Sequence, residues 1–175
     1  METRTVVICG ECAAFWDPDA EAPTCTDPSH EHHAYESHLH RTPVTFPDGT
    51  EIIAVSFGGA DPYAREVAPG FGLYLDERWD PPWPHEHLDW PDFGVPADRD
   101  QVIATLSALR DRARSGERVE VGCYGAHGRT GTALAVLAVL CGGDPEDAVD
   151  WVRTTFCDRA VETDDQAAFV HSLPR

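Results

Sequence analysis

The chain has 175 residues, of which 31 are acidic and 13 are basic, so its formal net charge is -18. This length suits one domain of ordinary size, whose core can be stable without disulfides. The strong negative charge argues against nucleic acid or an anionic membrane as the main partner, because both would be repelled.

The first residues, Met1-Glu2-Thr3-Arg4, lack the basic and apolar regions of a signal peptide. No apolar run approaches the roughly 20 residues that cross a membrane. We therefore expect a cytoplasmic protein whose cysteines are reduced. The cysteines at positions 9, 12, 25, 123, 141 and 157 are then candidates for catalysis, metal binding or burial before disulfide formation.

Residues 1–41 form a predicted Cys/His-rich appendage, and residues 42–175 form the predicted main domain. The appendage holds three of the six cysteines and five of the nine histidines, with little periodicity. Cys9-x2-Cys12, followed by Cys25 and His30, is typical of a Cys3His zinc knuckle, in which the ion would be structural. The alternative fourth ligands are His32, His33, His38 and His40. The alternative to a metal site is a set of reduced surface cysteines and solvated histidines.

The main domain begins with strand patterns. Residues 44–46 and 52–55 flank the turn at 47–49 and predict a hairpin, and Phe71 to Leu75 predicts a further strand. The stretch 78–96 carries three of the five tryptophans and is too rich in proline for a helix or a central strand. We expect it to be a long functional loop.

Helical patterns dominate the second half of the chain. Helical spacing of Val102, Leu106 and Leu109 predicts a helix over 98–114, and the alternation at 117–121 predicts a strand that leads into Cys123. An apolar helix is predicted over 130–141, and further helices over 145–156 and 163–173. Cys141 and Cys157 lie at the ends of apolar helical stretches and are expected in the core. The order of elements predicts an α/β fold, with a central mixed sheet flanked by helices.

A strand ending in Cys123, a Gly-rich loop and a helix opening at Arg129 would direct backbone N–H groups at one point, which suits a phosphate. The same field favours the reactive thiolate of Cys123. Arg129 would grip two phosphoryl oxygens with its planar fork, as Lys could not. Taken singly, Cys123 could be an inert core cysteine and Arg129 a surface charge. Their spacing and setting make that combination improbable.

The pattern Cys-x5-Arg-Thr-Gly resembles the signature His-Cys-x5-Arg-Ser/Thr-Gly of the protein tyrosine phosphatase superfamily. The resemblance implies a phosphatase fold, a phosphocysteine intermediate on Cys123 and no metal in catalysis. It implies that Thr130 hydrogen-bonds the thiolate. It also implies that the loop residues bind the substrate phosphate, namely Tyr124, Gly125, Ala126, His127 and Gly128. Gly122 departs from the signature, because it stands where the family usually has His.

The segment Trp90-Pro91-Asp92-Phe93-Gly94-Val95-Pro96 resembles the acid loop of the same family. The resemblance assigns Asp92 as the general acid and later the general base, whereas Asp89 is the rival by position. Residues 162–166 resemble the family's water-positioning segment, which points to Gln166. Glu162 stands where tyrosine-specific members have Gln. Gln166 could equally be an ordinary polar residue near a helix start.

The short chain resembles the compact dual-specificity branch, which implies a phosphotyrosine or phosphoprotein substrate. One alternative is a small acidic phosphoester, such as an inositol phosphate, a nucleotide or an RNA 5′ end. The other is a binding module that captures phosphorylated ligands with little catalysis. His127 could indicate a substrate with extra negative charge or could pack beside the loop, and Tyr124 could line the rim or pack.

Overall fold

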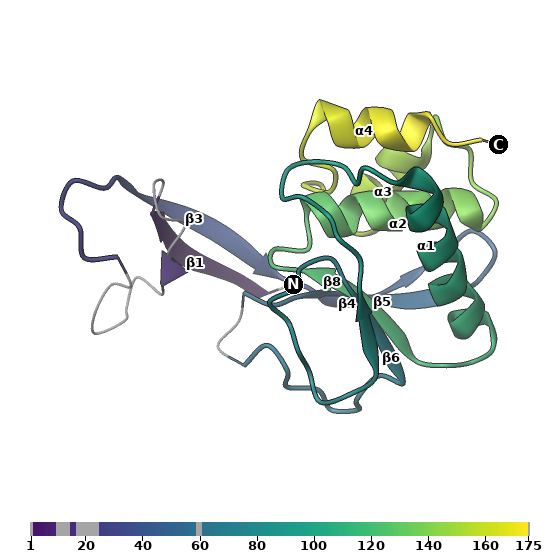
Figure 1. The fold of residues 1–175 in the computed structure, drawn as a ribbon, viewed down its shortest axis with the longest axis horizontal. Coiled ribbons are helices and arrows are strands. Elements are labelled where there is room, and N and C mark those ends of the chain that lie inside the picture. Colours follow the sequence, from purple (N-terminus) through teal and green to yellow (C-terminus); the bar gives the residue numbers. More distant parts are fainter. Residues whose placement is uncertain (1, 10–14, 17–24, 59–60, 175) are drawn as a thin grey trace. The chain divides into compact units, whose positions relative to one another are not determined.

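The computed structural model describes residues 2–9, 15–16, 25–58 and 61–174. The chain divides into two compact units, residues 1–39 and residues 40–175, and each is described by itself (Figure 1). In the first unit, β1 (Glu2–Cys9) pairs antiparallel with β2 (Phe15–Trp16) and with β3 (His32–Leu39). These strands were not predicted from the sequence. The signal was the β-branched run Thr5-Val6-Val7-Ile8, which favours a strand.

The second unit contains a mixed sheet with the strand order β4-β5-β8-β6-β7. The predicted hairpin is confirmed as β4 (Arg41–Thr45) and β5 (Glu51–Ser56). The central strand β8 (Val119–Cys123) runs parallel to β5 and to β6 (Phe71–Tyr74). At the edge, β7 (His85–His87) pairs parallel with β6, inside the stretch predicted as a loop. An edge strand of this length tolerates the prolines around it.

The predicted helices of the main domain are confirmed as α1 (Arg99–Arg114), α2 (Gly128–Leu140), α3 (Ala148–Thr155) and α4 (Asp164–His171). Asp98 caps α1, because its carboxylate accepts the N–H of Gln101 at 3.0 Å. Helix α2 is buried on nearly all sides, as its apolar sequence predicts. Within the described residues, we find no helix with the length and apolarity needed to cross a bilayer.

Strand β5 shows how the sheet separates two apolar layers. Ile52 and Ala54 pack into the core formed with the helices, whereas Ile53 and Val55 pack with Phe57 on the opposite face. Side chains alternate between the two faces of a strand, so one buried strand contributes to both layers. In the second layer the ring of Phe57 stacks on Trp79 at 4.3 Å between centroids. The α/β fold predicted from the sequence is confirmed.

Candidate active site

Cys123 lies at the carboxyl end of β8, and the chain enters α2 at Gly128 after a short loop. The parallel strands β5, β8 and β6 end at the same edge, where ligands bind in many α/β folds. Cys123 is 2% exposed, and the Thr130 hydroxyl donates to its sulfur at 3.0 Å. The structure therefore brings Cys123 and Thr130 into contact, in a loop that opens onto a helix N-terminus.

The backbone of this loop contains one strained residue, Ala126, and one carbonyl, that of His127, which accepts two hydrogen bonds. Ala126 adopts a φ of 59°, which is left-handed backbone that costs energy for a residue with a Cβ. The carbonyl of His127 accepts the N–H of Gly131 at 2.9 Å and that of Val161 at 3.3 Å. A Cβ at Gly131 would lie 2.8 Å from Ala160 Cβ and from the backbone nitrogen of Val161. Only glycine allows α2 to approach this segment so closely.

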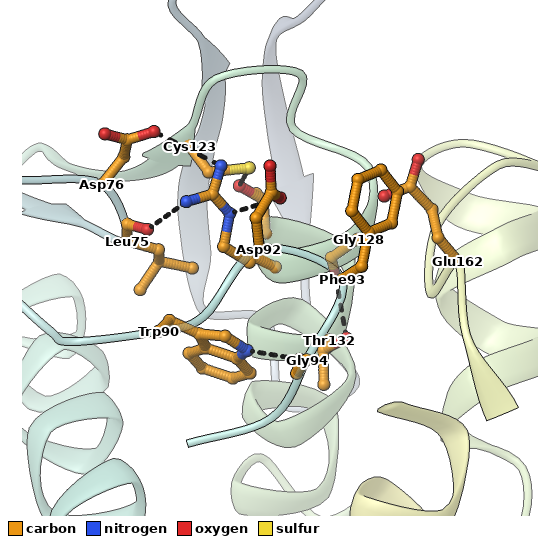
Figure 2. Close-up of polar contacts among 12 residues, drawn as sticks. Leu75, Asp76, Trp90, Asp92, Phe93, Gly94, Cys123, Gly128, Thr132 and Glu162 are labelled. Carbon is orange, nitrogen blue, oxygen red and sulfur yellow. Dashed lines mark hydrogen bonds and ion pairs between the residues drawn. The ribbon is translucent and has the colours of Figure 1, made fainter. Parts of the chain in front are cut away.

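Arg129 contacts oxygen atoms of three residues from two other segments, and Figure 2 labels these partners as Leu75, Asp76 and Asp92. Its guanidinium donates to the Leu75 carbonyl at 2.9 Å and to the Asp76 carboxylate at 3.3 Å. Its Nε forms an ion pair with Asp92 Oδ1 at 3.2 Å. The residue is only 6% exposed, so these contacts fix the direction of the guanidinium.

Asp76 positions Arg129 through its carboxylate. The sequence patterns did not predict this role. Burial raises its pKa, but hydrogen bonds from Arg78 and the positive charges of Arg78 and Arg129 outweigh that effect, so the pKa lies below its ordinary value. The signal was positional: Asp76 follows directly after the predicted strand that ends at Leu75. Recognising it required knowing that this strand lies beside β8.

Asp92 lies on a tight loop, and its side chain reaches Arg129. Trp90 is 3% exposed, and its indole N–H donates to the Gly94 carbonyl at 3.1 Å. The side chain of Asp92 is 63% exposed, which leaves it accessible from the cleft. Asp89, the rival carboxylate, is also exposed. The structure thus brings Asp92 together with Arg129, although the two are far apart in sequence.

Gln166 ties this loop to α4. Its side-chain oxygen accepts the N–H groups of Glu162 at 2.9 Å and Thr163 at 3.3 Å, which completes a capping box with Thr163. Its side-chain nitrogen donates to the Gly94 carbonyl at 3.3 Å. Gln166 is fully buried, so in this structure its amide holds the loop of Asp92 at α4.

Glu162 is a further carboxylate of the site, and the sequence assigned it no role. The residue is exposed as a whole, but its carboxylate lies where a Cβ on Gly128 would collide with it. Desolvation and then repulsion from Asp92 raise the pKa of Glu162, against a hydrogen bond from the Gly128 N–H. In Figure 2 it lies on the α4 side of the site, beside Phe93.

The remaining loop residues have separate environments. His127 is 3% exposed, and its Nε2 lies 3.3 Å from Nε2 of His40, so its imidazole packs inside the fold. Tyr124 stacks against Trp79 at 6.3 Å between ring centroids and lies under the guanidinium of Arg78. Both side chains pack against other residues of the fold, and their part in substrate binding stays a prediction.

The predicted zinc knuckle falls largely outside the described residues. Cys12 is not described, and for Cys9 only the backbone is described, as the last residue of β1. Cys25 is buried, and its sulfur lies 3.3 Å from Nδ1 of His30. These two ligands are adjacent, and the four-ligand site stays a prediction.

Strand β8, the loop after Cys123 and α2 together have the strand-loop-helix geometry of an anion-binding site. The family model described as protein-tyrosine phosphatase matches residues 81–173, and the chain belongs to this family. Catalysis in this family requires no cofactor.

Two uncharacterized proteins of Methanocaldococcus jannaschii are 35% and 34% identical over 109 residues. Each match covers 56% of this chain, and the two matches cover 71% and 66% of those proteins. The chain is also similar to Tk-PTP in its active form, at 25% identity and a TM-score of 0.59, over 73% of this chain and 92% of that one. Kinase associated phosphatase shares the fold at 15% identity and a TM-score of 0.61, over 77% of this chain and 92% of that one.

Proposed function

We propose that the chain hydrolyses phosphomonoesters through a phosphocysteine intermediate, with phosphotyrosine or phosphoprotein as substrate. The observation that carries the proposal is the convergence of Cys123, Arg129 and Asp92 at one edge of the sheet. The family gives the phosphatase chemistry. The convergence would supply a nucleophile, together with a phosphate clamp that contacts a proton donor.

In the first step, the Cys123 thiolate attacks phosphorus, so that a P–S bond forms while the ester P–O bond breaks. Asp92 gives its proton to the leaving oxygen. Arg129 holds two phosphoryl oxygens, and a bound phosphate replaces Asp92 at Nε of Arg129. The ion pair seen here thus keeps the clamp aligned before substrate arrives.

In the second step, water attacks phosphorus and the P–S bond breaks. Asp92 takes the proton of the water, and the thiolate returns to Cys123. The hydroxyl of Thr130, 3.0 Å from the sulfur, stabilises the departing thiolate. Gln166 holds the loop of Asp92 through Gly94, which keeps the carboxylate near the phosphate in both steps.

The charge of the cleft favours a phosphoprotein over a polyanionic small molecule. A cavity of about 530 Å³ at the site is lined by the carboxylates of Asp76, Glu77, Asp89 and Asp92, against the guanidinium groups of Arg78 and Arg129. The positive charges of Arg78 and Arg129 can balance the negative charge of one phosphate. Further phosphates, as on an inositol polyphosphate, would face carboxylates and be repelled.

Hydrolysis of an aryl phosphate tests the mechanism. Cys123→Ser should abolish turnover, and Asp92→Asn should lower kcat by about 10²- to 10⁴-fold. Asp89→Asn is the matched control and should stay near wild type, because Asp89 makes no ion pair with Arg129 among the contacts of the described residues. Wild-type turnover no greater than that of Cys123→Ser would refute the enzyme and leave the binding module.

Substrate preference requires a second assay. Wild type should hydrolyse phosphotyrosine peptides with a higher kcat/KM than inositol polyphosphates or nucleotides. Mass spectrometry of wild type quenched during turnover should show a phosphate on Cys123. A preference for polyphosphorylated small molecules would contradict the charge argument while leaving the chemistry intact.

A further inference from the structure

We propose that the second unit holds a site for a zinc-type divalent ion, formed by His40, His127 and Cys157. The nitrogen and sulfur atoms of these side chains lie within 4.8 Å of one another. All three residues are buried, with exposures of 2%, 3% and 5%. His40 directly precedes β4, His127 lies in the loop after Cys123 and Cys157 follows α3, so only the tertiary structure unites them.

The separation of the two imidazoles fits a tetrahedral ion, and the Cys157 sulfur lies within 4.8 Å of both nitrogens. Zinc binds imidazole nitrogen at about 2.0–2.1 Å and thiolate sulfur at about 2.3 Å. In a tetrahedron these bond lengths place two nitrogens roughly 3.3 Å apart and a nitrogen and a sulfur roughly 3.6 Å apart. Nε2 of His40 and Nε2 of His127 lie 3.3 Å apart. The fourth position would be open to water.

The donor set selects the kind of ion. Imidazole and thiolate ligands suit Zn²⁺ and its late transition-metal neighbours, whereas Mg²⁺ and Ca²⁺ prefer oxygen ligands. The net charge of -18 raises the local concentration of any cation near the protein. A hydrogen bond between the two imidazoles explains their contact, and the Cys157 thiol has a long contact of 3.8 Å to Asp158 Oδ1, but neither contact requires the sulfur to lie beside both imidazoles.

Metal binding would act through His127 on the loop from Cys123 to Arg129, which we call the catalytic loop. The carbonyl of His127 accepts the N–H groups of Gly131 and Val161, and Arg129 lies two residues further on. An ion on the imidazole would therefore fix the loop from inside the fold. This site differs from the predicted zinc knuckle of the first unit, for which His40 was one of the alternative ligands.

Zinc stoichiometry tests the proposal in the full chain. We would use Cys123→Ser as the background, because the catalytic thiolate also binds zinc. Zinc per chain, measured by mass spectrometry of the metal, should fall by about one ion in His40→Gln and in Cys157→Ala. Cys141→Ala is the matched control, since Cys141 is buried but lies outside the cluster. Equal zinc content in folded samples of all these variants would overturn the site.

A second measurement needs no variant at the proposed ligands. Zinc at about ten times its Kd should slow alkylation of Cys157 by about tenfold, because only the metal-free fraction reacts. A chelator should restore the rate, and Cys141 in the same sample should be unaffected. Peptide mass spectrometry reads both cysteines. Alkylation of Cys157 at the same rate with and without zinc would also overturn the proposal.

Discussion

The replacement Gly122→Ala tests why glycine precedes Cys123, the proposed nucleophile. A Cβ at this position would lie 2.5 Å from the Val55 carbonyl oxygen, 2.5 Å from Val55 Cγ2 and 3.2 Å from the ring of Phe57. Val55 is the register partner of Gly122 across β5 and β8, so the oxygen belongs to the backbone of a central strand. It cannot rotate away, and the sheet must shift to admit the methyl group.

The expected loss of stability follows from these contacts. Overpacking a core costs about 1–3 kcal/mol, and contacts to fixed backbone place this site at the upper end. Replacing glycine within a strand regains about 0.5–1 kcal/mol of backbone entropy. The net loss is therefore about 2 kcal/mol, which lowers the Tm by roughly 4–8 °C in a chain of this length. Because Cys123 is the next residue, kcat on an aryl phosphate should fall as well.

Gly58→Ala is the matched control for Gly122→Ala. The three atoms nearest to its added Cβ belong to the Tyr124 side chain, at 3.6 Å or more, which is ordinary contact. We expect its stability to equal or slightly exceed that of wild type. Urea and thermal unfolding compare the three proteins. If Gly122→Ala is as stable as Gly58→Ala, the crowding at β5 does not explain why the family histidine is absent.

Two further predictions concern buried charges of the main domain. Arg65→Ala should lower the free energy of unfolding by about 3–5 kcal/mol, because it removes the bidentate partner of Glu120, whose side chain is 1% exposed. Adding Glu120→Gln to this variant should recover part of the loss in urea unfolding. No recovery would contradict the charge explanation. Asp76→Asn should lower stability at pH 7, because the folded pKa of Asp76 lies below 3.8 and its ionised form stabilises the fold. That contribution is lost as pH falls through the folded pKa of Asp76. The Tm values of the variant and of wild type should therefore converge below this pKa when thermal unfolding is measured against pH. A difference in Tm that stays constant with pH would refute the ion-pair account.

The catalytic loop and the acid loop could be predicted from sequence because each is a continuous segment. A phosphate site made of backbone N–H groups and a helix N-terminus needs a strand, a glycine-rich turn and a helix in immediate succession. That requirement appears as spacing between Cys123 and Arg129. The apolar run of α2 likewise predicts a buried helix, and the hairpin follows from its turn residues.

Contacts between distant segments could not be predicted in this way. Asp76 holds Arg129 only because β6 lies beside β8, and the role of Gln166 in holding Gly94 depends on where α4 packs. Strand β7 was missed because its pairing comes from β6 and not from its own sequence.

The sequence by itself determined the candidates for the chemistry of the site, because the proposed nucleophile, clamp and proton donor each lie in a short segment with a characteristic pattern. The tertiary structure decided the surroundings: which carboxylates face Arg129, why position 122 has no space for a side chain, and which residues meet His127. These depend on packing between elements separated by many residues. Such packing depends on shape and burial in three dimensions, and residue spacing along one chain does not record it.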